Sequence, residues 1–286
     1  MQTLDRIALR DWPLPHADDA SDKEDRGQVL VVAGSREIPG AALLSATAAL
    51  RAGAGKLTIA TAQSVAAGLA LLMPEARVIG LPETPAGGLQ PSGLAQLTTC
   101  AQQSSAVLIG PGLMDSEGSC EFIAGLLRHL GDVPVILDAL AMDVLLQLPR
   151  FDQPVLLTPH AGEMAHLSGQ SKEEVMAKGV VLAGDMCQKH NVVMALKGAT
   201  TYIVSPEGAH WCHVSGNAGL GTSGSGDVLA GIMTGLAARG APLPQAAAWG
   251  VLLHALAGQR LAERHGRVGF LAREILKEIP SVMRDI

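Results

Sequence analysis

Aromatic residues are scarce in this chain, which has three Trp, one Tyr and three Phe among 286 residues. Nucleic-acid surfaces that stack on bases need aromatic side chains and an excess of Lys and Arg. Here the formal net charge is −6. A base-stacking nucleic-acid surface and a basic membrane-surface helix are therefore not expected. The core must be built from aliphatic residues instead, since 48% of the chain is hydrophobic.

Cysteines are also few and widely separated. The four of them, Cys100, Cys120, Cys187 and Cys212, form no C-x-x-C pair and have no histidine at metal-ligand spacing. We expect reduced thiols in a cytoplasmic protein, and neither a disulfide framework nor a zinc site. The polar N-terminus predicts no signal peptide. No uninterrupted apolar run reaches the roughly 18 residues that a membrane span needs, so none is expected.

The chain divides into a short arm and one domain. Residues 1–26, with Pro13, Pro15 and an acidic run at 18–25, are predicted to be a polar arm that is mobile or loosely docked. Residues 27–286 contain no linker, repeat or low-complexity tract, which predicts a single α/β domain. Its expected architecture is a doubly wound, mostly parallel sheet with helices on both faces.

Strand-like and helix-like segments alternate through this domain. The strands of the parallel sheet are expected at residues 28–35, 56–61, 106–109, 134–138, 154–157 and 192–196. The helices are expected at residues 40–51, 121–130, 172–190, 228–239, 244–264 and 271–283. Two short runs, 200–204 and 210–214, flank a Pro-Glu-Gly segment and predict an antiparallel hairpin.

A glycine-rich stretch, Asn217–Asp227, leads directly into the apolar helix at 228–239. A glycine-rich loop that begins a helix leaves backbone N–H groups unpaired at the positive end of the helix dipole, which suits an anion such as phosphate. We expect the N–H groups of Gly224, Ser225 and Gly226 to form this anion hole, with Asp227 facing it. The alternative is that Asp227 only favours the helix N-terminus and the glycines only make a turn.

Polar or glycine-rich groups follow several of the expected strands. They are Gly34-Ser35, Gly110-Pro111-Gly112, Asp138, His160 and Lys197-Gly198. In open α/β sheets ligands bind outside the carboxyl ends of the strands. The sequence therefore predicts one ligand cleft at that edge of the sheet.

These groups belong to an ordered series of short motifs. The series is G-S at 34–35, P-G-A-A at 39–42, G-P-G at 110–112, L-D-A at 137–139, T-P-H-x-G-E at 158–163, L-K-G at 196–198 and G-S-G-D at 224–227. In order and spacing the chain resembles the NAD(P)H-hydrate dehydratases over about residues 27–285. Those are ribokinase-like enzymes that repair hydrated nicotinamide cofactor, using ADP or ATP.

The resemblance implies roles for individual residues. Contacts with the NADH or NADPH hydrate are implied at Ala41, Gly112, His160 and Asp227. Contacts with the adenine nucleotide are implied at Lys197, Gly198, Ala199, Thr200, Thr201 and Gly226. Nucleotide phosphates normally travel with Mg²⁺, so we expect this ion, although we assign it no protein ligand. The resemblance also implies a homo-oligomer, commonly a tetramer. The small-residue helix at 40–50 and the apolar C-terminal helices are the faces expected for assembly. Nothing the size of the family's epimerase domain precedes Gly27, so any epimerase is expected to be a separate protein.

Three positions depart from the family pattern, namely Ser223, Ala161 and Leu140. Ser223 stands where many relatives have glycine, and its Cβ is expected to crowd the loop. Glu163 is expected to hold its own loop or to reach a metal-bound water. We expect Ser64, His254 and His265 to be structural.

Asp227 is the candidate general base for the implied reaction. Hydroxide leaves poorly, and phosphorylation of the hydrate hydroxyl converts it into a good leaving group. The nearby helix N-terminus predicts a low pKa for Asp227. Two alternatives remain open from the residues: a kinase of the same fold that acts on a hydroxymethylpyrimidine or thiazole alcohol, and a non-catalytic nucleotide-binding module.

Overall fold

The computed structural model describes residues 1–15, 22–114 and 116–286, which contain a ten-stranded sheet. Across the sheet the order is β1-β10-β9-β8-β7-β6-β5-β2-β3-β4. The strands are β1 (Gln2–Thr3), β2 (Gln28–Val32), β3 (Lys56–Ala62), β4 (Ala76–Leu81), β5 (Ala106–Ile109), β6 (Val135–Leu137), β7 (Val155–Leu157), β8 (Val193–Leu196), β9 (Thr200–Val204) and β10 (His210–Val214). All neighbours from β8 to β4 are parallel, and β9 and β10 form the predicted antiparallel hairpin.

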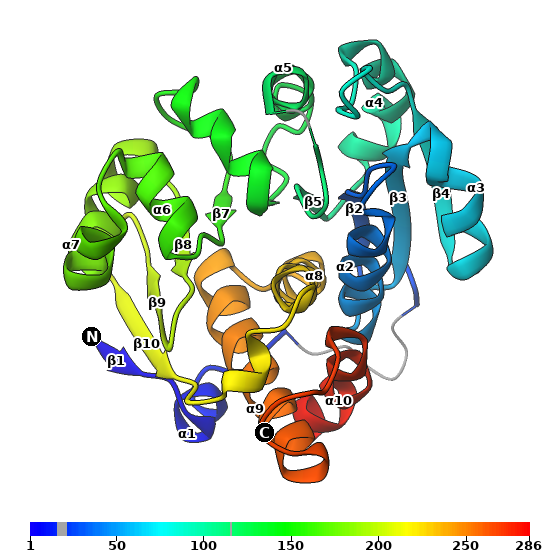
Figure 1. Ribbon diagram of the computed structural model, residues 1–286. Coiled ribbons are helices and arrows are strands. Elements are labelled where there is room, and N and C mark those ends of the chain that lie inside the picture. The colour runs from blue at the N-terminus through cyan, green and yellow to red at the C-terminus, as the bar shows by residue number, and fades with distance from the viewer. Residues whose placement is uncertain (16–21, 115) are drawn as a thin grey trace.

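Helices cover both faces of this sheet, as Figure 1 shows. They are α1 (Arg6–Arg10), α2 (Pro39–Arg51), α3 (Gln63–Leu72), α4 (Leu94–Gln102), α5 (Ser116–Leu127), α6 (Ala161–Ser168), α7 (Lys172–His190), α8 (Ser225–Ala238), α9 (Leu243–His265) and α10 (Ala272–Arg284). In β2, Val29 and Val31 join the core beneath α2, α8, α9 and α10, whereas Leu30 and Val32 face α4 to α7. The predicted doubly wound α/β architecture is confirmed. No helix in the described part of the chain is long and apolar enough to cross a membrane.

Chain order reverses between two central strands of the sheet. From β2 the chain proceeds outward to β3 and β4, then returns to β5 on the other side of β2 and continues to β8. The loops that follow β2 and β5 therefore separate at this point, which leaves a crevice at the carboxyl ends of the strands. Gly34 and Gly112 lie in those two loops.

Helix α8 runs antiparallel to β2 and so brings its N-terminus to the same edge. A Cβ on Gly27, just before β2, would lie 2.0 Å from the carbonyl oxygen of Ala238 at the end of α8. Helices α8 and α2 pack closely against each other. Cβ atoms on Gly231 and Gly235 of α8 would lie 2.1 and 2.3 Å from carbonyl oxygens of α2.

This packing corrects one expectation about assembly. The small side chains of α2 are buried against α8 within a single chain: Ala41, Ala42, Ser45, Ala46, Ala48 and Ala49 are all at most 3% exposed. A face that is already covered cannot serve as a subunit interface. The helix at 40–50 therefore gives no support for an oligomer.

The described N-terminal residues are packed onto the domain and are neither mobile nor loosely docked. Strand β1 pairs with β10, and Leu4 and Leu9 are 2% and 0% exposed. The Trp12 ring stacks on Trp211 with centroids 5.4 Å apart. Two apolar anchors and an aromatic pair outweigh the polar composition that suggested an arm. Residues 18–21 of the acidic run lie outside the described residues.

Replacing Leu9 with Ala is expected to lower the free energy of unfolding by about 2–5 kcal/mol, the usual result of truncating a buried leucine. The matched control is Ile7→Ala on the same helix, where the side chain is 67% exposed and the expected change is within about 0.5 kcal/mol. Urea denaturation of both variants makes the comparison. Equal, small losses would mean that this segment does not contribute to the stability of the domain.

Candidate active site

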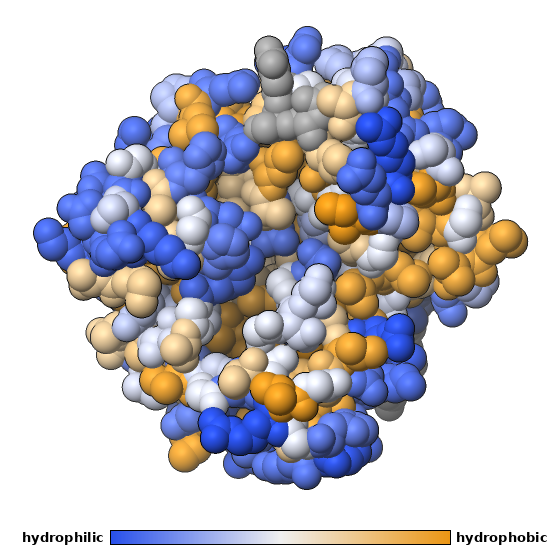
Figure 2. Space-filling view, viewed as in Figure 1, coloured by the Kyte–Doolittle hydropathy of each residue, from blue (hydrophilic) through white to orange (hydrophobic). Residues whose placement is uncertain are grey.

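A cavity of about 670 Å³ opens at the carboxyl edge of the sheet, beside the N-terminus of α8. The space-filling view shows this face hollowed next to its centre (Figure 2). Five of the residues predicted to contact the nucleotide line it, together with His160: Lys197, Gly198, Ala199, Thr201 and Gly226. Apolar side chains of Leu220, Leu229, Val251 and Ala255 form another part of its wall. The cavity thus combines an apolar wall with a charged and glycine-rich one, as a nucleotide requires.

Thr200 is the predicted nucleotide residue that does not line this cavity. It borders a smaller hollow of about 460 Å³ beneath α7. Successive residues of a strand point to opposite faces of the sheet, so the side chains of Thr200 and Thr201 in β9 point opposite ways.

The T-P-H-x-G-E motif forms the N-terminus of α6. His160 is the N-cap residue, and its Nδ1 accepts hydrogen bonds from the N–H groups of Gly162 (2.9 Å) and Glu163 (3.1 Å). In return the carboxylate of Glu163 accepts from the His160 N–H at 2.7 Å. A Cβ on Gly162 would lie 2.9 Å from the imidazole Cε1, so the motif has little room for a side chain there. Since Nδ1 accepts, the proton of the neutral ring is on Nε2, in a side chain that is 60% exposed. By accepting the hydrogen bond from the His160 N–H, Glu163 holds its own loop, which is one of the two roles expected for it.

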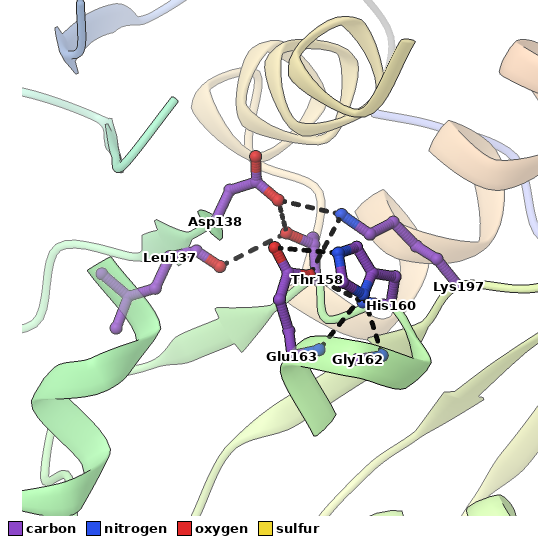
Figure 3. A network of polar contacts seen from close by, with 7 residues as sticks. All are labelled: Leu137, Asp138, Thr158, His160, Gly162, Glu163 and Lys197. Atoms are coloured by element: carbon purple, nitrogen blue, oxygen red, sulfur yellow. Dashed lines mark hydrogen bonds and ion pairs between the residues drawn. The ribbon is translucent and has the colours of Figure 1, made fainter. Parts of the chain in front are cut away.

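Thr158, the first residue of this motif, forms a polar network with Asp138 and Lys197 (Figure 3). The Thr158 hydroxyl donates to Asp138 Oδ1 at 2.6 Å, and Lys197 Nζ lies 3.1 Å from the same oxygen. The Asp138 side chain is only 4% exposed. A carboxylate is rarely buried to this degree unless it is paired. The sequence marked Asp138 only as a polar residue after a strand, and its part in the site was missed.

Lys197 links this network to the glycine-rich loop. A Cβ on Gly226 would lie 3.5 Å from Lys197 Nζ, so the ammonium group reaches the first turn of α8. Burial tends to lower the pKa of Lys197, but the carboxylates of Asp138 and Glu163 outweigh it and raise the pKa above its ordinary value. Lys197 is therefore a permanent positive charge at the cavity wall.

Asp227 has a raised pKa, which corrects the low value expected from the helix dipole. Burial, followed by repulsion from the Asp138 carboxylate, raises the pKa of Asp227 to about 6, although Lys197 acts in the opposite direction. Burial is the largest cause of the shift, because it removes water from the charged form of the carboxylate. At neutral pH Asp227 is mostly ionised and is a stronger base than an exposed aspartate.

The N-terminus of α8 differs from expectation at one amide. Gly224 is the N-cap residue with φ 85°, but the Ser225 N–H donates to the Thr222 carbonyl at 3.2 Å. The amides of Gly224 and Gly226 have no backbone partner among the described residues. The Ser225 side-chain hydroxyl forms a hydrogen bond with His254 Nε2 at 2.9 Å. His254 was expected to be structural, yet it lines the cavity, and burial lowers its pKa to about 4, so its ring is neutral.

Ala41 and Gly112 lie together at the crevice where chain order reverses. A Cβ on Gly112, which has φ 67°, would lie 2.7 Å from both the Ala41 Cβ and the Ile38 carbonyl oxygen. Ala41 is 3% exposed and occupies the first turn of α2, so its amide is the group available to a ligand. A Cβ on Gly224 would lie 2.5 Å from Leu44 Cδ1 on α2 and 3.8 Å from Asp227 Oδ2. Asp227 is thus close to α2.

The departure at Ser223 causes no backbone strain. Ser223 is exposed and its φ is not positive, so its Cβ is accommodated without crowding the loop. Ala161 is the first residue of α6, and Leu140 is half-buried next to Ala139, whose φ is 50°.

The acid limb of the pH–rate profile is expected to report Asp227. Activity should fall below about pH 6, where this carboxylate becomes protonated. Asp138→Asn removes a negative charge that raises the pKa of Asp227, so the limb should move to lower pH whatever the height of the plateau. Asp185→Asn, an exposed position on α7, should leave the limb in place. An acid limb unmoved by Asp138→Asn would disprove the coupling between the two carboxylates.

Solved structures of known proteins show the same fold. The fold resembles that of a ribokinase-like superfamily protein from Enterococcus faecalis with TM-score 0.86 and 27% identity, covering 99% of this chain and 95% of that one. An ADP/ATP-dependent NAD(P)H-hydrate dehydratase of Bacillus subtilis, co-crystallised with ATP/Mg²⁺, gives TM-score 0.81 and 32% identity over 95% and 94% of the two chains. The architecture is therefore ribokinase-like.

The family follows from the sequence matches. A model of the NAD(P)H-hydrate dehydratase family matches residues 29–281. An ADP-dependent (S)-NAD(P)H-hydrate dehydratase of Xanthomonas campestris is 47% identical over 286 residues, which cover 99% of this chain and 96% of that protein. The chain belongs to the NAD(P)H-hydrate dehydratase family. A bifunctional NAD(P)H-hydrate repair enzyme of Moorella thermoacetica is 37% identical, and the match spans 52% of its length.

Proposed function

We propose that this protein restores hydrated NADH and NADPH to the normal cofactor in a nucleotide-dependent dehydration. One observation carries the proposal: a permanent cation, Lys197, and a carboxylate of raised pKa, Asp227, both lie near the N-terminus of helix α8, beside a nucleotide-sized cavity. The cation and the Gly224 and Gly226 amides suit a transferring phosphoryl group. The carboxylate suits a general base, which removes the proton from the substrate hydroxyl as that hydroxyl attacks the phosphoryl group.

The proposed chemistry has three steps. The hydrate hydroxyl attacks the terminal phosphorus of ADP, its proton passes to Asp227, and a new oxygen–phosphorus bond forms as AMP leaves. The carbon–oxygen bond then breaks while the lone pair of the ring nitrogen forms a carbon–nitrogen double bond, and phosphate departs. The adjacent ring carbon then loses a proton to water, which completes the dihydronicotinamide. With ATP the departing nucleotide is ADP.

The remaining residues take binding roles in this proposal. The Nε2–H of His160 and the Ala41 amide donate hydrogen bonds to the hydrate. Gly112 contacts it through its backbone, because a Cβ at that position would collide with Ala41 and Ile38. The nucleotide lies in the 670 Å³ cavity along Lys197, Gly198, Ala199 and Thr201. Thr200 contributes through its backbone, because its side chain borders the other hollow.

A single assay separates this function from its alternatives. Hydrated NADH is mixed with ADP, and separately with ATP, and the absorbance of the dihydronicotinamide is followed together with released phosphate. Nucleotide-dependent return of both signals supports the dehydratase. Consumption of nucleotide with a pyrimidine or thiazole alcohol, and no return of absorbance with the hydrate, indicates the kinase. Binding without turnover indicates a nucleotide-binding module.

Several finer features belong to the same proposal. Among the described residues no group of three His, Cys, Asp or Glu side chains has the arrangement of a metal site. Mg²⁺ needs no such group, because it commonly binds one or two carboxylates plus substrate phosphates, and we propose that it arrives with the nucleotide and neutralises phosphate charge. We also propose a cytoplasmic homotetramer, which light scattering checks, working with a separate hydrate epimerase.

A further inference from the structure

His213 brings the N-terminal segment of the chain into contact with the nucleotide cavity. Strand β9 is antiparallel to both β8 and β10, so β10 ends at the same edge of the sheet as β8. His213, near the end of β10, pairs directly with Thr201 and lines the cavity with it. Directly paired residues of antiparallel strands point their side chains to the same face, about 4.5–5.5 Å apart. His213 therefore stands next to a residue of the predicted nucleotide-binding stretch.

The hydrogen bond made by His213 fixes which ring nitrogen carries the proton. Nδ1 lies 3.0 Å from the carbonyl oxygen of Leu4. A carbonyl oxygen only accepts, so Nδ1 must carry the hydrogen. The neutral imidazole has a single N–H group, which leaves Nε2 as an acceptor. Among the described residues Nε2 has no hydrogen-bond partner.

Leu4 is held firmly enough to impose this tautomer. Its N–H donates to the Cys212 carbonyl at 2.7 Å, and its side chain is 2% exposed. Figure 1 shows β1 lying along β10, and the Trp12–Trp211 stack fastens the segment further along. The Leu4 carbonyl therefore cannot turn away without breaking the pairing of β1.

We propose that His213 is a specificity residue for the nucleotide, with Nε2 accepting a hydrogen bond from an N–H or O–H donor of the nucleoside. Two groups of an adenine nucleotide have this chemistry: the exocyclic amine of the base and the hydroxyls of the ribose. The apolar wall of Leu220, Val251 and Ala255 binds a flat base without fixing its orientation, and a directional acceptor supplies that orientation. The inference rests on the proposed nucleotide-dependent function.

The test measures dissociation constants by calorimetry for ADP, for inosine diphosphate and for 2′-deoxy- and 3′-deoxy-ADP. Inosine replaces the amine with a carbonyl, and each deoxy analogue removes one hydroxyl. His213→Phe is expected to weaken ADP binding roughly 3- to 10-fold, the value of one neutral hydrogen bond. It should leave binding unchanged for whichever analogue lacks the donor, which identifies the group. His213→Gln, whose amide oxygen can accept, should retain part of the preference. His210→Phe, on the same strand but away from the cavity, should match the wild type for all four nucleotides.

A second readout concerns the tautomer directly. The ¹⁵N spectrum of the wild-type protein, assigned by loss of the signals in His213→Gln, should show a protonated Nδ1 and an unprotonated Nε2. A protonated Nε2, an equal loss of affinity for all four nucleotides, or no loss for any of them overturns the inference. If the wild type itself binds no ADP, the proposed function fails with it. If the wild type binds ADP and turns over, and His213→Phe is unchanged, the role of His213 alone fails.

Discussion

Replacing Asp227 with Asn is expected to reduce turnover of hydrated NADH with ADP by roughly 10²–10⁴-fold, the usual effect of losing a general base. The amide cannot take up the proton of the hydrate hydroxyl. Nucleotide binding should be retained, because the Gly224 and Gly226 amides and Lys197 are unchanged. The absorbance assay gives the rate, and calorimetry with ADP gives the affinity.

The control for this substitution is Asp152→Asn, the same chemical change at an exposed position, which should keep the wild-type rate. A folded Asp227→Asn variant that binds ADP and dehydrates at close to the wild-type rate would remove Asp227 from catalysis.

The same substitution should also stabilise the fold near neutral pH. The pKa of Asp227 is about 6 in the folded protein, against an ordinary value of 3.8. Between those values the folded state binds more protons than the unfolded state, so stability falls as pH rises, and the loss persists above pH 6. Asn removes a penalty of at most roughly 3 kcal/mol. A residue that only served the helix dipole would give the opposite sign, a loss of up to about 1 kcal/mol. Urea denaturation at pH 7 and pH 4 distinguishes the two.

Local signals in the sequence predicted much of the fold. Helix α7 has the predicted bounds because its ends are specified by neighbouring residues, a capping box at Ser171 and a left-handed Asn191. Helix α5 begins at Ser116 and ends at Leu127, several residues earlier than predicted. Strand β4 (Ala76–Leu81) was missed: it is an edge strand with mostly half-buried residues, so it has neither a continuous apolar run nor a clear alternation. The docking of the N-terminal segment was missed because its partners, Trp211 and Trp249, are more than 190 positions away in the chain.

For the candidate site too, contacts within a short motif could be predicted, whereas contacts between distant residues could not. The T-P-H-x-G-E motif was recognisable because His160, Gly162 and Glu163 contact one another within four residues. Asp138 and Lys197 are 59 positions apart in the sequence, and Ser225 and His254 are 29 apart. No local sequence pattern predicts either contact. The error in the pKa of Asp227 has the same origin. The helix dipole is a local effect visible in the sequence, whereas burial and the charge of Asp138 appear only in the folded chain.

Replacing Lys197 with Met is expected to lower the free energy of unfolding by about 3–5 kcal/mol, because it leaves the Asp138 carboxylate buried without its cation. It should also weaken ADP binding by about 1.5–3 kcal/mol, the value of a hydrogen bond to a charged group. The acid limb of the pH–rate profile should move to higher pH, because Lys197 lowers the pKa of Asp227 and its removal would let that pKa increase. Urea denaturation, calorimetry and the pH–rate profile measure the three effects. Lys277→Met, at an exposed position on α10, should change stability by no more than about 0.5 kcal/mol.

The double variant Lys197→Met/Asp138→Asn separates the two roles of the lysine. With the carboxylate neutralised, the buried site no longer holds an unpaired charge, and Thr158 can still donate to the amide oxygen at position 138. Most of the lost stability should therefore return, because removing both members of a buried pair is often close to neutral. The affinity for ADP should stay low, because no cation remains beside Gly226 to meet the phosphate. A double variant that regains both stability and ADP affinity would mean that Lys197 serves only as the counter-ion of Asp138, and would remove it from the nucleotide site.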